Sequence, residues 1–150
     1  MKFIALDVGS KRIGVASCDR LEIAASPHSV VPAGKDAPAA IARLVESEEA
    51  DGLVVGLPLS LDGGEHGEAS RIVRAFVERL QPLIRVPLEF VDERFTTNMA
   101  VASLIESGMR REKRREIRDA VSAALILKTF LDRRRSANPP DPTDEPQRTQ

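Results

Sequence analysis

Short apolar runs separated by turn residues fill the first part of the chain. Phe3–Leu6 is a continuous apolar run, typical of a strand that is buried on both faces. The Gly9-Ser10 turn separates it from a second run at 13–16, and a longer third strand is predicted over 22–31. Because the connections between these runs are short, we expect three antiparallel strands.

The pattern changes after Asp36, which is expected to cap a helix with Pro38 in its first turn. From there the spacing of apolar residues predicts, in chain order, a strand at 52–56, a loop at 57–67, a helix at 69–80, a strand at 86–91, a helix at 99–107 and a helix from about 115 to 134. The order predicts an α/β fold. We expect a five-stranded mixed sheet, three antiparallel strands followed by alternating helices and strands, with helices on both faces.

Composition divides the chain into a domain and a tail. Residues 136–150 hold four prolines and no Ile, Leu, Val or Phe, so we expect them to be disordered. Residues 1–135 form one predicted domain, since a chain of 150 residues is about one domain long. No apolar run reaches the roughly 18 residues of a membrane span or the length of a signal-peptide core, and Cys18 is the single cysteine. We therefore expect a cytoplasmic protein with no membrane contact.

Three acidic residues occupy positions that are unusual for acids. Asp7 closes the most apolar strand, and Glu93 directly follows the last strand. On a helical wheel, Asp119 falls within the apolar arc of the final helix and not on its polar side. A buried carboxylate needs a partner or a metal ion. Asp7 could instead cap the Gly9 turn or pair with Lys11 or Arg12, Glu93 could pair with Arg94, and Asp119 could pair with Arg94 or Lys11.

Carboxylates contributed by a first strand, a later strand end and a last helix could meet at one edge of the sheet. Oxygen ligands of this kind suit Mg²⁺ or Mn²⁺. Two such ions about 3.5–4 Å apart can activate a water and stabilise the leaving oxygen in phosphodiester hydrolysis. The three acids therefore indicate a two-metal hydrolytic site.

Four motifs in the same order resemble the YqgF/RuvX family over about residues 1–133. They are Asp7–Ala16, Gly56–Leu59 with Asp62-Gly63, Asp92–Thr97 and Asp119–Leu127. The resemblance implies an RNase H-like fold and a metal-dependent nuclease, in which Asp7, Glu93 and Asp119 would bind the metal and serve catalysis. Members are described as Holliday junction resolvases and as nucleases that mature the 5′ end of pre-16S rRNA. RNase H enzymes usually have a fourth acid, which has no clear counterpart here, and Phe95 stands where the family often has Leu.

Basic residues accompany the acids along the sequence. Lys11 and Arg12 lie in the hairpin beside Asp7, and Arg94 follows Glu93, so all three are candidates to contact phosphate. A basic run before Asp119 is expected to guide a nucleic-acid backbone, although such runs are also common on solvated faces: Arg110, Arg111, Lys113, Arg114, Arg115 and Arg118.

The functional hypotheses differ in substrate. The leading one is an RNA-processing nuclease acting on the 5′ end of pre-16S rRNA. The alternatives are a resolvase of four-way DNA and a non-catalytic nucleic-acid-binding factor in ribosome assembly or transcription. Aromatic residues are 3% of the chain, which favours recognition by backbone and shape over base stacking. We expect a monomer or a homodimer, since the sequence reveals no dimer interface.

Overall fold

The computed structural model describes residues 1–58, 67–93 and 111–137, with only the helical backbone for 111–115. Five strands form one sheet in the order β3-β2-β1-β4-β5. The strands are β1 Phe3–Val8, β2 Arg12–Cys18, β3 Ala25–Pro32, β4 Gly52–Leu57 and β5 Leu88–Asp92. The first three are antiparallel neighbours, whereas β4 runs parallel to both β1 and β5. The predicted mixed sheet is therefore confirmed.

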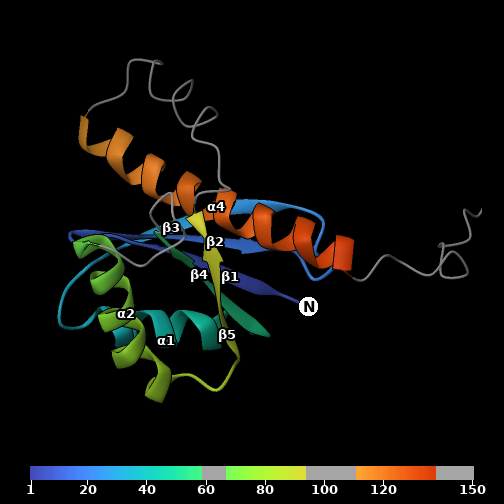
Figure 1. Ribbon diagram of the computed structural model, residues 1–150, viewed down its shortest axis with the longest axis horizontal. Helices are drawn as coiled ribbons and strands as arrows, with labels where there is room; N and C mark the ends of the chain where they lie inside the picture. The colour runs from blue at the N-terminus through green and yellow to red at the C-terminus, as the bar shows by residue number, and fades with distance from the viewer. Residues whose placement is uncertain (59–66, 94–110, 138–150) are drawn as a thin grey trace, which may run out of the picture.

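Helices cover both faces of this sheet, as predicted (Figure 1). They are α1 Ala37–Ser47, α2 Glu68–Leu80, the short 3-10 helix η1 Gln81–Leu83 and α4 Arg111–Ala137. Helices α1 and α2 share one face, and α4 crosses the other. No helix among the described residues is long and apolar enough to span a membrane.

Several expected boundaries change in the structure. Strand β3 starts at Ala25 and not at residue 22, because Glu22 lies in a turn with a left-handed φ of 58°. Asp36 occupies the N-cap position of α1, but its side chain makes no capping hydrogen bond. Helix α4 extends to Ala137, two residues beyond the expected domain boundary. The expected helix at 99–107, most of the loop at 57–67 and residues 138–150 of the expected disordered tail lie outside the described residues.

Alternation along the strands divides the core into two layers. One layer, under α1 and α2, takes branched side chains from the sheet such as Ile4, Leu6 and Val55. The other layer, under α4, takes smaller ones from the sheet such as Ala5, Ala16 and Val54, against Ala123 and Leu127 of the helix. The small side chains allow α4 to lie close to the strands, which matters for the site below.

Candidate active site

Helix α4 approaches strand β2 most closely at Gly14. A Cβ atom on Gly14 would overlap the backbone carbonyl of Asp119, so any side chain there would push the helix away. Gly14 is the register partner of Asp7 on β1, and Arg12 lies two residues along β2 on the same face. The sheet register and one glycine thus bring Asp7, Arg12 and Asp119 together.

Asp7 and Glu93 form a hydrogen-bonded pair of carboxyl groups. Burial raises the pKa of Glu93 to about 7, and the negative charge of Asp7 and the hydrogen bond to it act in the same direction. Burial also raises the pKa of Asp7; the hydrogen bond from Glu93 opposes this shift, Asp119 adds to it and the positive charge of Arg118 opposes it. Glu93 is therefore the proton donor of the pair.

Asp119 makes an ion pair with Arg12. The Nε–H of Arg12 donates to Oδ2 of Asp119 at 2.7 Å, with side chains 32% and 25% exposed. Of the ion-pair partners considered from the sequence, Lys11 makes no such bond and Arg94 lies outside the described residues. The partner of Asp119 is instead Arg12, which sequence analysis had considered only for Asp7 and for phosphate.

The three acids line one polar cavity of about 270 Å³. Its other lining residues are Arg118, Ser122, Leu125 and Ile126, all on α4. The cavity lies where β1 and β5 end, which is the edge of an α/β sheet at which ligands usually bind. The structure thus places Asp7, Glu93 and Asp119 at one cavity, and their metal-binding and catalytic roles stay a prediction.

A second glycine makes room for Glu93. A Cβ atom on Gly56 of β4 would lie 2.6 Å from Oε1 of Glu93 and 2.5 Å from Cδ1 of Ile126. The structural roles of Gly14 and Gly56 were not predicted from the sequence. The available signal was their place inside strands, where an isolated glycine often marks a close backbone approach.

The donor set suits a divalent metal ion in its chemistry. All three acids offer carboxylate oxygens, which Mg²⁺ and Mn²⁺ prefer, and the Asp7–Glu93 pair holds a proton that a cation could replace. No group of three or more acidic, His or Cys side chains within the described ranges is arranged to enclose a metal ion. Asp119 is bound to a cationic side chain, Arg12.

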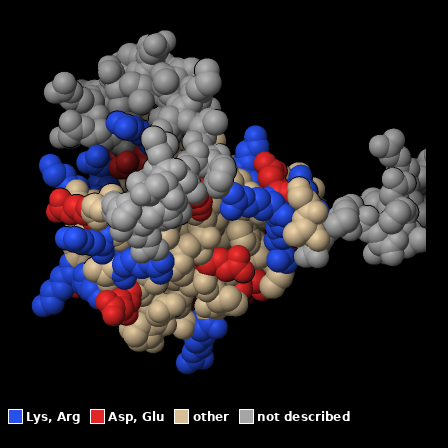
Figure 2. Space-filling view, viewed as in Figure 1, with Lys and Arg blue, Asp and Glu red and all other residues tan. Residues whose placement is uncertain are grey.

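Only some of the basic residues predicted to contact phosphate lie within the described part of the chain. Arg118 lies at the acids, and Lys11 is exposed at the start of β2. Arg94 and Arg110 lie outside the described residues, and so do the side chains of Arg111, Lys113, Arg114 and Arg115. On the face shown in Figure 2, Lys and Arg side chains alternate with Asp and Glu. A nucleic-acid role for these residues stays a prediction.

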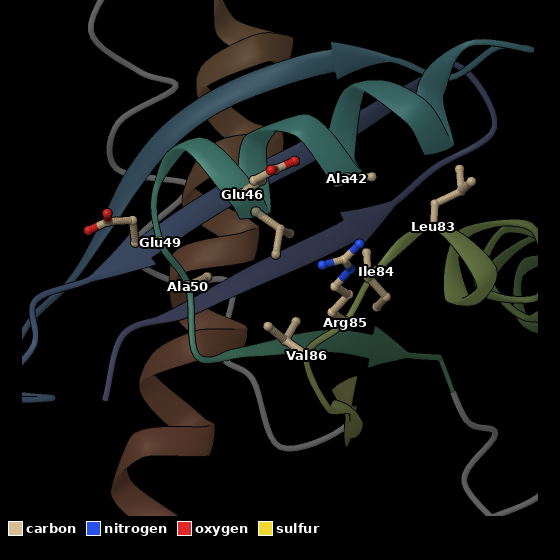
Figure 3. Close-up of a pocket in the computed structure, with 9 residues that line it drawn as sticks. Ala42, Glu46, Glu49, Ala50, Leu83, Ile84, Arg85 and Val86 are labelled. Atoms are coloured by element: carbon tan, nitrogen blue, oxygen red, sulfur yellow. The ribbon is translucent and has the colours of Figure 1, made fainter.

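Another cavity, of about 490 Å³, lies elsewhere (Figure 3). It is formed by the end of α1 and by residues 83–86, which lead into β5. Glu46, Glu49 and Arg85 are its charged residues among apolar neighbours. Since none of the three catalytic candidates lines it, this cavity does not belong to the site.

Comparison with known proteins agrees with this geometry. A family model named RuvX and described as Holliday junction resolvase matches residues 1–133. A protein of Streptomyces avermitilis named "Putative pre-16S rRNA nuclease" is 46% identical over 136 residues, covering 88% of this chain and 86% of its own length. A protein of the same name from Roseiflexus is 41% identical, covering 89% and 96%.

Solved structures of resolvases share the fold. The Thermus thermophilus RuvC structure superposes with a TM-score of 0.57 at 12% identity, covering 91% of this chain and 97% of that one. A fowlpox virus resolvase in complex with Holliday junction DNA gives 0.56 at 12% identity, covering 89% and 98%. The expected RNase H-like fold is confirmed. The match over residues 1–133 and the close relatives confirm the resemblance seen in the four motifs, and the chain belongs to the RuvX family.

Proposed function

We propose that this protein is a metal-dependent nuclease that hydrolyses phosphodiester bonds at the 5′ end of pre-16S rRNA in the cytoplasm. The observation that carries the proposal is the Asp7–Glu93 carboxyl pair facing Asp119 across one polar cavity. The names of the relatives at 41% and 46% identity support the choice of substrate.

Asp7, Glu93 and Asp119 would hold two Mg²⁺ or Mn²⁺ ions. When bound, such ions activate a water for attack on phosphorus and stabilise the leaving 3′ oxygen. The fit rests on the oxygen-only donor set and on the proton shared by Asp7 and Glu93. Glu93 would have to lose this proton for its carboxylate to serve as a metal ligand.

Cationic side chains would hold the nucleic-acid backbone at the acids. Arg118 lines the acid cavity and its positive charge opposes the negative charge of Asp7, which supports a role for its guanidinium in binding a phosphate. Lys11, Arg94 and the basic run at 110–115 would extend this contact along the strand. Recognition through phosphates also agrees with the low aromatic content.

Substitution of the acids tests the proposal directly. Asp7→Asn, Glu93→Gln and Asp119→Asn should each lower cleavage of a pre-16S rRNA 5′ fragment in Mg²⁺ or Mn²⁺ by at least about 100-fold, because each loses a metal ligand. The matched control is Asp132→Asn, an exposed acid on the same helix, which should cleave like the wild type. Full cleavage by Asp7→Asn would overturn the mechanism.

Four-way DNA is the second candidate substrate. It is favoured by the description of the matching family model as Holliday junction resolvase. Cleavage of precursor rRNA and of a four-way junction should be compared side by side with the oligomeric state in solution, because symmetric cutting of a junction needs two active sites. Binding that survives a chelator, with no cleavage of either substrate, would support the non-catalytic alternative.

A further inference from the structure

Arg12 has a fixed backbone and a side chain that can move. Its backbone carbonyl accepts a hydrogen bond from the N–H of Gly9 at 2.9 Å, which closes the turn between β1 and β2. In the sheet, Arg12 is the register partner of Pro32 on β3. Its side chain is about one-third exposed and leaves the sheet toward α4. A change of partner by Arg12 therefore needs only side-chain rotation, with no movement of the strand.

The bond to Asp119 uses a single nitrogen of the guanidinium. Nε is the one Arg12 nitrogen with a hydrogen-bond partner among the residues that the structure describes. As far as the described residues go, its two terminal amino groups are open to donate in the paired, planar geometry that matches phosphate oxygens. Arg12 thus contacts an acid of the site from outside the lining of the acid cavity, and it carries donors of a kind that phosphate oxygens accept.

The same bond competes with a metal ion at Asp119. A guanidinium at 2.7 Å occupies Oδ2, and its positive charge would repel a cation bound to the same carboxylate. This agrees with the finding that the acids among the described residues are not arranged to enclose an ion. Asp7 and Glu93 are a ready pair, whereas Asp119 is engaged by a positive charge.

We propose that Arg12 is a positioning residue that keeps Asp119 from binding metal until nucleic acid arrives. We call the Arg12–Asp119 ion pair the latch. A backbone phosphate attracts the guanidinium away from Oδ2, and the freed carboxylate then completes the metal site. Metal loading would in this way depend on substrate, which would limit hydrolysis of unintended targets. The inference rests on the proposed nuclease function and adds to it the order in which metal and substrate are bound.

The test is the affinity for Mn²⁺ measured by titration calorimetry. Without nucleic acid, Arg12→Gln should bind Mn²⁺ about three- to tenfold more tightly than the wild type, because a competing ion pair and a repelling charge are removed. With a phosphorothioate fragment of the precursor RNA bound, the difference should fall below twofold. If Arg12 only oriented Asp119 for metal binding, Arg12→Gln would bind Mn²⁺ more weakly than the wild type.

Two control variants isolate the latch. Arg20→Gln removes an exposed arginine that pairs with Glu49 at 3.0 Å, away from the acids, and should bind Mn²⁺ like the wild type. In an Asp119→Asn background, Arg12→Gln should change the Mn²⁺ affinity by less than twofold, because only the repelling charge and no ion pair is left to remove. Equal or weaker binding by Arg12→Gln in the original background would overturn the proposal.

A measurement on the unaltered protein is independent of how well the variants fold. In ¹⁵N–¹H spectra, the Arg12 Nε–H signal should be protected from exchange by its bond to Asp119. Mg²⁺ alone should leave this signal in place, and Mg²⁺ with the phosphorothioate RNA should shift it. A shift caused by Mg²⁺ alone would show that metal opens the latch without substrate, against the proposal.

The two proposals fail in different ways. Wild-type Mn²⁺ binding that Asp7→Asn does not weaken would count against the metal site itself and therefore against the proposed nuclease. Mn²⁺ binding that depends on Asp7 but is insensitive to Arg12 would overturn the latch alone.

Discussion

The two faces of the sheet use the same strands in opposite ways. Under α1 and α2, the strands present branched side chains such as Ile4 and Leu6, which fill the space between sheet and helices. Under α4, the strands present alanines and Gly14 beside a few larger side chains such as Phe3, and the helix backbone lies closest to the sheet at Gly14. Large side chains fill the core under α1 and α2. Under α4, small residues let the helix backbone come close to the strands.

The carboxyl groups of the site need this close approach of the helix and strands to come together. Glu93 fits beside Asp7 because Gly56 has no side chain, and Asp119 reaches Arg12 because Gly14 has none. The comparison teaches that the α4 face carries both packing and chemistry, so small changes there should affect activity, whereas equal changes on the α1 and α2 face should affect stability alone.

The largest effect is expected at Gly14. Gly14→Ala should lower the free energy of unfolding by about 3 kcal/mol or more and remove most cleavage, because its Cβ meets the Asp119 backbone, which cannot rotate away. Thermal unfolding and cleavage of precursor RNA would measure both effects. The matched control is Gly34→Ala, whose Cβ would have no atom within 4 Å and which should stay within about 0.5 kcal/mol of the wild type. Equal behaviour of the two variants would refute the close-approach argument.

The next effect is a pH dependence of stability in the metal-free protein. The folded-state pKa of Glu93 is about 7, above its ordinary value of 4.5. Its contribution to stability is therefore complete below about pH 4.5 and is lost as the pH rises through 7. We expect a loss on the order of 1–2 kcal/mol over this range, after allowing for solvent screening at a partly exposed site. Chemical denaturation in EDTA at a series of pH values measures it.

Glu93→Gln should remove this part of the pH dependence, because the amide does not titrate. Glu89→Gln on the same strand, where the side chain is exposed, should leave it intact. Saturating Mg²⁺ should reverse the trend, since a cation binds the ionised acids and stabilises the folded state as the pH rises. A flat profile for the metal-free wild type would contradict the buried carboxyl pair.

The sequence predicted the strands and the helix faces because both follow from local periodicity. The apolar run at Phe3–Leu6 predicted a buried strand, and it lies in β1. The wheel position of Asp119 placed it within the apolar arc of the helix, and its side chain is about one-quarter exposed. The partner of Asp119 could not be predicted in the same way. It depends on which residue of β2 lies under the helix, and this is set by sheet register and by the Gly14 contact, neither of which is local in sequence.

The smallest effect gives the sharpest comparison, because the same substitution can be made on both faces. Ile41 of α1 and Ile126 of α4 are each at most 2% exposed. Ile41→Val and Ile126→Val should each cost about 1 kcal/mol of stability, since each removes one buried methyl group. Ile126 also lines the acid cavity and faces Gly56 beside Glu93, so Ile126→Val should in addition lower the cleavage rate a few-fold. Ile41→Val should cleave at the wild-type rate at a temperature where both variants are folded. Equal rates for the two variants would mean that packing on the α4 face does not position the acids.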